Sequence, residues 1–422
     1  MISISPLQTL CYNKSVNINK PIMRLYQKFH YDELYRFFRT DFWQFELSAW
    51  LHVFGQSLIS VFIPIILLKT GYSLNEVILF YLIFNIFNLP LNFFAHFFTY
   101  RFGAKKATAL GTIAYIIFFI LFYSLTPGNW PLLIFMAFFV SLYDALYWVS
   151  HIYFFVKCSP HKNNIQRDNS LLYIAKKFAG VLAPLFGALI IIFTTEHILI
   201  LCSIIILILS LWPLFQIRDI DDRPKHPPVS FRAFFSSWRD LKEYLITAFN
   251  SFHVVAEGMI WPIYIYTIFE SVQSVAAIPI IVSLTTMIFT YFSGHVKKSN
   301  RETMIVTGAA LIALTWITRL LFSNAIFYFI TIFLIGLFTI LISLPLESTI
   351  FEKAEKKDIL TASTYRNLFA MAPRILFYGV LYLIINVFPV SFIAAAAGMF
   401  IIIFLSLIVF PPDKLKSVKN DA

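Results

Sequence analysis

The chain has 422 residues, of which 59% are hydrophobic and only 13% are charged, and its mean hydropathy is +0.76. Its net charge is +11, from 33 Lys and Arg against 22 Asp and Glu. Soluble proteins carry about 25% charged residues and at most about 50% apolar ones, so these values argue against a soluble enzyme, a nucleic-acid-binding domain and a disordered chain. We predict an integral membrane protein whose basic loops face anionic membrane lipids.

Long apolar runs follow one another along the chain, separated by charged residues or by Pro and Gly. A bilayer core about 30 Å thick requires roughly 20 helical residues for each span. The runs lack the alternation of barrel strands, so helices are predicted. The predicted spans are 47–68, 75–99, 107–125, 131–156, 171–193, 197–216, 244–268, 273–294, 303–322, 325–346, 362–387 and 390–410. The predicted fold is therefore all-α, with twelve transmembrane helices in two bundles of six.

The longest internal polar stretch divides the chain into two bundles, 47–216 and 244–410. A basic and aromatic segment, 1–46, precedes them, and a short tail, 411–422, follows them. Within the linker 217–243, apolar residues recur at helical spacing with Arg and Lys between them, which predicts a short amphipathic helix on the membrane surface. These apolar residues are Phe231, Phe234, Phe235, Trp238 and Leu241.

The loops differ strongly in basic residues on the two sides of this predicted topology. The side that holds both termini and the linker has 27 Lys and Arg, whereas the other side has only Lys69 and Arg319. The positive-inside rule then places both termini and the linker in the cytoplasm, and the chain in the plasma (inner) membrane as a multi-pass protein.

Several classes of chemistry lack their sequence signature. The three cysteines, Cys11, Cys158 and Cys202, are widely spaced, which argues against a disulfide framework or a cysteine metal site. The sequence contains no phosphate-binding loop of the type that drives pumps with ATP, and no metal cluster, nucleophile elbow or cofactor loop. We predict a protein that is not an enzyme and that holds no metal and no cofactor.

Two local motifs accompany the pattern of six helices, a basic linker and six more helices. The turn 96–106 contains Arg101, Gly103 and Lys105 at the spacing of a Gly-x-x-x-Asp-Arg-x-Gly-Arg-Lys motif, although His and Tyr replace its Gly and Asp. The run 180–188 contains Pro184 and Gly187 and is similar to a Gly-Pro-x-x-Gly-Gly stretch. In these features the chain resembles the major facilitator superfamily, whose two halves are parallel repeats. The resemblance implies a monomeric transporter that binds a small-molecule substrate.

The resemblance also implies that the spans 47–68, 131–156, 244–268 and 325–346 line a central cavity. Three of these spans carry polar or aromatic side chains at helical spacing, and charges inside a bilayer usually line a cavity or are paired. Arg374, in the span 362–387, is a basic residue that could face the cavity or pair with a carboxylate. The candidate pathway residues are His52, Gln56, Asp144, Trp148, His151, Asn250, His253, Glu257, Trp261 and Arg374.

Asp144 and Glu257 are the two carboxylates near the middle of predicted cavity helices, and each has a histidine on the same face. A buried carboxylate with a neighbouring histidine can take up and relay a proton. The sequence therefore predicts a secondary active transporter that works by alternating access and is coupled to protons. An exporter or flippase of amphipathic drugs or lipids, and a non-transporting membrane receptor or scaffold, are the alternatives that the sequence leaves open.

Overall fold

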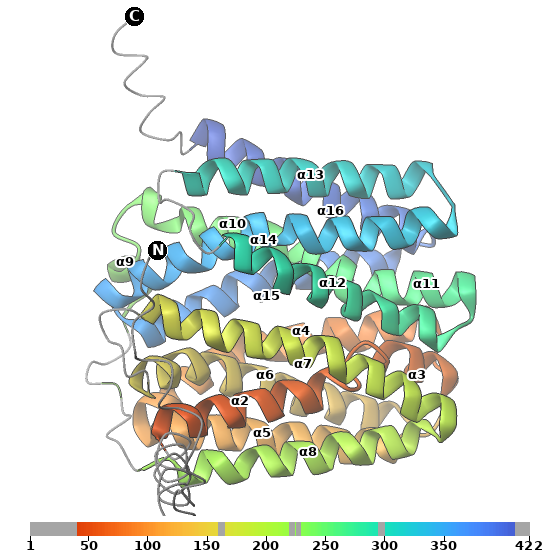
Figure 1. The fold of residues 1–422 in the computed structure, drawn as a ribbon, viewed down its shortest axis with the longest axis horizontal. Helices are drawn as coiled ribbons and strands as arrows, with labels where there is room; N and C mark the ends of the chain where they lie inside the picture. Colours follow the sequence, from red (N-terminus) through yellow and green to blue (C-terminus); the bar gives the residue numbers. More distant parts are fainter. Residues whose placement is uncertain (1–39, 159–164, 219–223, 225–228, 294–299, 410–422) are drawn as a thin grey trace, which may run out of the picture.

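The computed structural model describes residues 40–158, 165–218, 224, 229–293 and 300–409. Most of the predicted N-terminal segment, residues 219–223 and 225–228 of the linker, and the C-terminal tail lie outside these residues. The described chain forms long helices that run nearly parallel to one another in two groups, and the second group follows the first in sequence (Figure 1). The all-α prediction is confirmed.

The N-terminal half consists of α2 (Asp41–Ser57), α3 (Ile63–Lys69), α4 (Leu74–Phe102), α5 (Ala104–Tyr123), α6 (Trp130–Cys158), α7 (Ile165–Phe193) and α8 (Glu196–Gln216). The first predicted span is not one helix, because turns separate α2 from α3 at residues 58–62. Pro64 lies at the start of α3, where its missing N–H costs no hydrogen bond. Gly103 joins α4 to α5 with a φ of 95°, a conformation that favours glycine.

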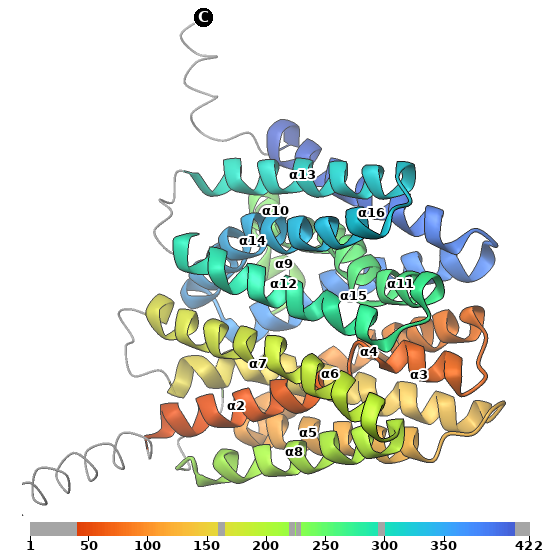
Figure 2. The same cartoon turned by 45° about the vertical axis from the view of Figure 1, so that its right-hand side comes forward.

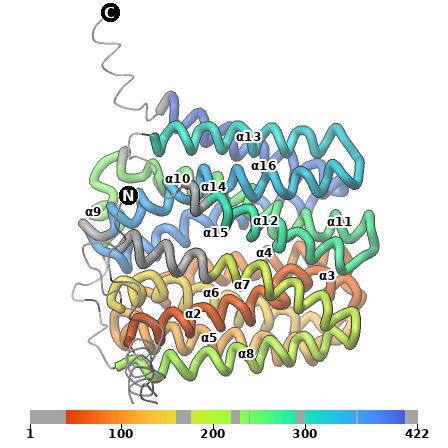
Figure 3. The backbone as a smooth tube through the Cα atoms, in the orientation of Figure 1, coloured from red at the N-terminus to blue at the C-terminus, as the bar shows by residue number. Residues whose placement is uncertain are grey.

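The C-terminal half consists of α10 (Trp238–Val255), the π-helix η1 (Ala256–Ile260), α11 (Trp261–Phe269), α12 (Val272–Ser293), α13 (Arg301–Leu321), α14 (Ala325–Lys356), α15 (Ile359–Leu383), α16 (Val387–Phe404) and the π-helix η3 (Leu405–Val409). The segments α10, η1 and α11 follow one another without a break and form a single rod. Figure 3 traces this rod and its neighbours as a continuous tube.

Ten helical segments within the described residues are long and apolar enough to cross a membrane. The rods α2–α3 and α15 are not among them, since the first is broken and the second carries charged and polar side chains such as Arg366 and Arg374. Together the two rods and the ten segments give the predicted twelve. Large apolar side chains such as Phe97 and Phe135 are exposed on the outer surface, as expected for helices that face lipid tails.

Two helix pairs join the halves along their length. α7 packs against α12, and α4 packs against α15 (Figures 1 and 2). We call the end of the molecule where α9 (Phe231–Phe234) lies the linker end, and the end where α3 meets α4 the opposite end. At the opposite end, α3 also packs against α11, so the halves are in contact there.

The predicted amphipathic helix of the linker is replaced by a shorter structure. α9 has only four residues, and the next helix begins at Trp238, six residues before the predicted start of its span. Phe234 and Phe235 are buried against Tyr244 and Tyr365 of the C-terminal half. The aromatic side chains of this segment therefore anchor it to protein, and Trp238, which is 75% exposed, does not share in that packing.

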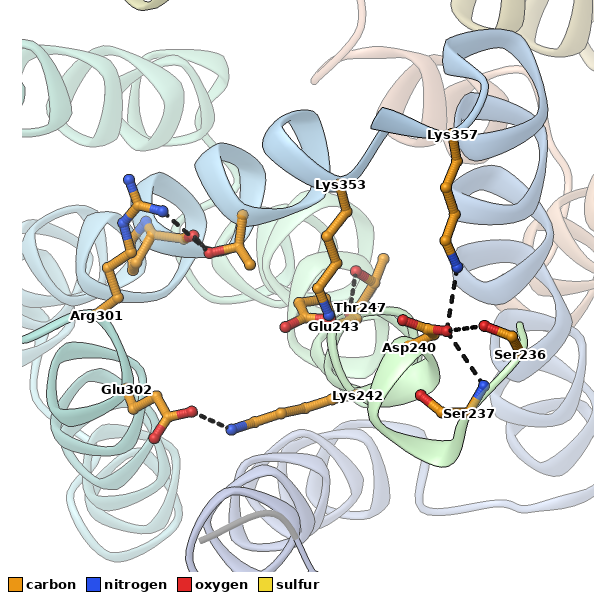
Figure 4. Close-up of polar contacts among 12 residues, drawn as sticks. Ser236, Ser237, Asp240, Lys242, Glu243, Thr247, Arg301, Glu302, Lys353 and Lys357 are labelled. Atoms are coloured by element: carbon orange, nitrogen blue, oxygen red, sulfur yellow. Dashed lines mark hydrogen bonds and ion pairs between the residues drawn. The ribbon is translucent and has the colours of Figure 1, made fainter. Parts of the chain in front are cut away.

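Ion pairs tie together the linker end of the C-terminal half (Figure 4). From α10, three charged side chains reach partners on or after other helices, and a fourth pair joins α13 to α14. We call this set the ion-pair belt: Asp240–Lys357, Lys242–Glu302, Glu243–Lys353 and Arg301–Glu352. Because the belt joins α10, α13 and α14, it holds the linker ends of these helices as one unit.

Candidate functional site

A cavity of about 480 Å³ lies between the two halves. It is lined by α6 and α7 of the N-terminal half and by α10, α14 and α15 of the C-terminal half. Its lining runs from Asp144, near the middle of α6, to Phe155, which is close to the linker-end terminus of that helix. Since α3 and α11 meet at the opposite end, the cavity extends toward the linker end.

Asp144 lies in the wall of this cavity, as the sequence predicts for a residue of the fourth span. Its Oδ2 accepts a hydrogen bond from the side-chain amide of Asn88 on α4, at 2.9 Å. Asn88 is fully buried and also contacts Asn92, one turn along the same helix. Within the described chain Asp144 makes no direct ion pair, but it interacts electrostatically with Arg374 across the cavity.

His151 shares the cavity with Asp144, two turns further along α6, but its contact is with a lysine. Lys176 Nζ lies 2.8 Å from His151 Nε2 and 5.4 Å from the centre of the Trp148 ring. Because an ammonium group only donates hydrogen bonds, Nε2 accepts and the ring proton lies on Nδ1. His151 is therefore a neutral acceptor for Lys176 and not a partner of Asp144 in the described contacts.

The C-terminal wall of the cavity carries two arginines from α15. Arg366 forms an ion pair with Glu347 of α14, at 2.7 Å. The guanidinium of Arg374 instead contacts the thioether of Met371, at 3.5 Å, and its buried Nε has no hydrogen-bond partner. The prediction that Arg374 faces the cavity agrees with its place in the lining, whereas a pairing of Arg374 with Glu257 does not form.

Glu257 is paired with Arg319, which the charge count assigns to the loops opposite the linker although the predicted span 303–322 contains it. Arg319, counted there as a charge outside the membrane, lies in α13 with a side chain that is fully buried. Its Nη1 donates to Glu257 Oε2 at 2.5 Å, and its guanidinium stacks 3.6 Å from the centre of the Trp261 ring. The loop assignment of Arg319 is therefore wrong: the arginine lies near the end of an apolar helix and its charge is balanced inside the half.

His253 is held by two hydrogen bonds that do not involve Glu257. The indole N–H of Trp316 donates to Nδ1 at 3.0 Å, so Nδ1 is the acceptor. Nε2 then carries the proton and lies 3.2 Å from Thr339 Oγ1. A proton relay between His253 and Glu257, which their spacing suggested, is not formed in this arrangement.

The candidate residues of the predicted span 244–268, which the structure forms as the rod α10–η1–α11, lie in two different environments. Asn250 lines the cavity, whereas His253, Glu257 and Trp261 lie outside the cavity lining and contact α13. For Glu257 and Trp261 the physical reason is η1, which begins at Ala256, whereas His253 precedes η1 and contacts α13 from the α-helical part of the rod. A π-helix has i to i+5 hydrogen bonds and more residues per turn, so side chains after its start are rotated relative to an α-helical stripe.

The two polar candidates of α2 also lie outside the cavity lining. His52 is buried, with Nε2 2.9 Å from the hydroxyl of Tyr143, and it stacks on Tyr147 at 3.8 Å. Gln56 forms a hydrogen bond with Tyr115. These side chains connect α2 with α5 and α6 inside the N-terminal half, so they fix helix packing there.

The residues of the turn motif have separate local roles. Arg101 is exposed, and Gly103 provides the positive φ of the turn. Lys105 donates a hydrogen bond to the carbonyl of Ile217, at 2.6 Å, just after the end of α8. A lysine there satisfies a carbonyl that follows a helix C-terminus.

The small residue of the α7 motif allows a close approach of backbones. A Cβ added to Gly187 would lie 2.1 Å from the carbonyl oxygen of Leu58 and 3.0 Å from the ring of Phe62. Both partners belong to the break between α2 and α3. Pro184, one turn earlier, lies inside α7. Gly187 of α7 therefore packs tightly against the break in the first predicted span.

The pathway candidates taken from the sequence do not include Asn88, Lys176, Glu347 or Arg319. The presence of Arg319 inside the apolar run 303–322 was the available signal, because a charge in a span is usually paired. Asn88 is an uncharged polar residue on a neighbouring helix, so the sequence carries no such signal for it. Among the described residues, no group of three His, Cys, Asp or Glu is placed to hold a metal ion.

The comparisons with known proteins bear on the whole fold. The family description "Major Facilitator Superfamily" matches residues 46–378. The crystal structure of the human organic anion transporter MFSD10 (TETRAN) is similar, with a TM-score of 0.64 and 11% sequence identity over 87% of this chain and 99% of that one. A search of curated protein sequences finds no match. The family match covers most of the chain, from the first rod into α15, and the chain belongs to the major facilitator superfamily of multi-pass membrane transporters.

Proposed function

We propose that the chain is a secondary active transporter that moves a small molecule through the central cavity by alternating access, with coupling to protons at Asp144. The observation that carries this proposal is the position of the cavity, which lies between the halves and has charged side chains of both in its wall. A solute bound there contacts both halves. Its binding is therefore able to favour one relative position of the halves over another.

The contacts between the halves support rocking as the motion. α7 and α12 pack tightly at Gly180, since a Cβ added there would lie 2.6 Å from the side-chain Oγ of Ser283. In the described conformation α3 touches α11 and the cavity extends to the linker end. Rotation about the α7–α12 and α4–α15 contacts would part α3 from α11 and close the linker end, so that the cavity faces the other side.

Asp144 has the surroundings that proton coupling requires. A charge inside a membrane protein costs several kcal/mol unless it is stabilised, about 2.5–3.5 kcal/mol on insertion scales. The amide of Asn88 and the charge of Arg374 stabilise the ionised carboxylate. Asn88 moves with Asp144, whereas Arg374 belongs to the other half. Rocking therefore changes the distance between Asp144 and its countercharge, and with it the preference of the carboxylate for a proton.

We further propose that the linker end faces the cytoplasm, with both termini there and the chain in the plasma (inner) membrane. Because Arg319 lies within α13, Lys69 is the one Lys or Arg that the count of loop charges leaves on the opposite side. Lys69 is paired with Glu196. Single cysteines at positions 225 and 356, in a cysteine-free background, should react with an impermeant reagent only from the cytoplasm. Labelling of either position from outside would contradict this orientation.

The transport proposal is tested with purified protein in liposomes that contain a pH-sensitive dye. A panel of small anions, cations and neutral solutes is added outside, with and without an imposed pH gradient. We expect at least one class to enter together with, or in exchange for, protons, and the dye signal to disappear with Asp144→Asn. Solute flux without any proton movement would contradict the coupling. Absence of flux for every class would favour a non-transporting receptor or scaffold.

A further inference from the structure

The wall of the cavity has more positive than negative charge. Arg366 and Glu347 neutralise one another in their ion pair. Lys176 and Arg374 remain, and Asp144 is the single carboxylate left in the lining to balance them, while Glu46, which interacts electrostatically with Lys176, is buried outside the lining. One cation belongs to α7 of the N-terminal half and the other to α15 of the C-terminal half. A complementary ligand therefore carries negative charge.

Both cations have hydrogen-bonding capacity that the protein does not use. Lys176 donates to His151 and lies over Trp148, and within the described residues it forms no ion pair with a carboxylate. An ammonium group has three donors and a guanidinium has five. Arg374 uses one donor on the weak acceptor Met371 Sδ, and its Nε is unpartnered. Such donors form strong, charge-assisted hydrogen bonds with anionic groups such as a carboxylate.

The rest of the cavity lining is divided between apolar and polar side chains. Trp148 and Phe155 contribute an aromatic surface from the N-terminal half, and the C-terminal half adds both apolar residues such as Phe351 and uncharged polar residues such as Asn250 and Asn367. The volume of about 480 Å³ lies within the range of roughly 300–1,000 Å³ that is usual for small-molecule sites. The site therefore has room for a compact molecule with one charged end and an apolar body that packs against the aromatic surface.

We propose that the transported solute is an organic anion whose carboxylate is bound jointly by Lys176 and Arg374, with its apolar body against the aromatic wall. The inference rests on the proposed transport function and specifies its substrate class. It also gives the anion a role in the cycle. Because the two cations belong to different halves, a bound anion favours those positions of the halves that bring both cations close to it.

The test compares three probes that share one apolar body and differ in charge: 1-naphthoate, 1-naphthamide and 1-naphthylmethylamine. Their binding to the purified full chain is measured by thermal shift and by competition against radiolabelled naphthoate. We expect naphthoate to bind and to be weakened about 10- to 100-fold by Lys176→Gln or Arg374→Gln, as for the loss of a hydrogen bond to a charged group. Lys106→Gln, the same change at an exposed lysine of α5 outside the cavity lining, is the control and should stay within about twofold of wild type.

Equal or tighter binding of the amide or the amine, no binding of naphthoate, or unchanged naphthoate affinity in both charge-removing variants would overturn the proposal. The charge-retaining variants Lys176→Arg and Arg374→Lys should keep most of the affinity, which separates loss of charge from loss of folding. The transport function is judged separately by naphthoate exchange in liposomes. Binding without exchange would refute transport and leave the anion site in place, whereas exchange of another class alone would refute the anion site.

Discussion

In the N-terminal half, Asp144 faces the cavity and accepts a hydrogen bond from a neutral amide, whereas in the C-terminal half Glu257 is bound by a buried arginine between two tryptophans. Both carboxylates lie near the middle of their helical rods. Asp144 has its countercharge, Arg374, on the other half of the molecule, and Glu257 has its countercharge, Arg319, on its own half. In the proposed rocking motion, the surroundings of Asp144 change and those of Glu257 stay intact.

The comparison shows that burial alone does not identify a coupling carboxylate. A buried ion pair within one rigid unit is maintained through any motion of that unit. Its carboxylate therefore stays ionised and does not take up a proton during the cycle. A carboxylate at the boundary between two moving units is different, because motion changes its electrostatic environment. The structure therefore supports Asp144 as the proposed proton site, which reverses the sequence-based order, in which Glu257 comes first and Asp144 second.

The largest expected effect separates the two carboxylates directly. Asp144→Asn should abolish proton-driven accumulation while exchange at equal pH persists, since the amide keeps the shape of the side chain and cannot lose a proton. Glu257→Gln should leave the accumulation ratio of the surviving protein unchanged. The measurement is accumulation and exchange of the same solute in liposomes, normalised to folded protein.

The double variant Glu257→Leu/Arg319→Met provides a control without a buried unpaired charge. It should retain proton-driven accumulation if Glu257 is structural. Loss of accumulation in this variant, together with normal exchange, would transfer the coupling role to Glu257 and reverse the comparison.

The next effect concerns the stability of the C-terminal half. Glu257→Gln leaves Arg319 as an uncompensated charge between Trp261 and Trp316, and breaking such a buried pair costs about 3–5 kcal/mol. We expect a pronounced fall in the thermal unfolding midpoint of the purified protein. Glu257→Leu/Arg319→Met should recover most of it, because apolar replacement of a whole buried pair is often neutral. Equal losses in both variants would show that the charges themselves are not the cause.

The predictable part of the fold is the part that hydropathy determines. Apolar runs of sufficient length identify the rods, and the i,i+7 spacing of Asp144 and His151 correctly places both on the cavity face. The same reasoning fails on the rod α10–η1–α11, where the π-helix η1 rotates Glu257 and Trp261 away from the helix face that carries Asn250. Helical spacing assumes a constant number of residues per turn, and a single π-helical turn invalidates it.

Partners across helices were the other part that the sequence could not provide. Arg319 lies 62 residues from Glu257, and Asn88 lies 56 residues from Asp144. Such pairs depend on how helices are rotated against each other, which one sequence does not encode in a local pattern. A charge inside an apolar run does indicate that a partner exists, so Arg319 was open to prediction as paired, but the identity of the partner was not.

A smaller effect is expected from crowding the break between α2 and α3. Gly187→Leu would drive a side chain into the Leu58 carbonyl, and overpacking of this kind costs typically about 1–3 kcal/mol. Gly379→Leu in α15 is the matched control, because nothing lies within 4 Å of its added Cβ. We expect Gly187→Leu to insert in the membrane but to lose exchange activity, with Gly379→Leu close to wild type. Normal exchange by Gly187→Leu would mean that the broken first span is free to shift.

The smallest effect is expected at the partly exposed ion pairs, one of which can be tested in each half. Glu302→Gln removes the partner of Lys242 in the ion-pair belt, and Glu196→Gln removes the partner of Lys69 at the opposite end. The side chains of Glu302 and Glu196 are 40% and 29% exposed, so solvent screens both pairs and each is worth only about 0–1 kcal/mol. The midpoint shifts should therefore be small in low salt and smaller still in high salt.

Because the belt joins helices that move as one unit, neither change should alter accumulation. A shift at Glu302 comparable to that of Glu257→Gln would instead show that the linker end of the C-terminal half depends on its charges as strongly as its interior does.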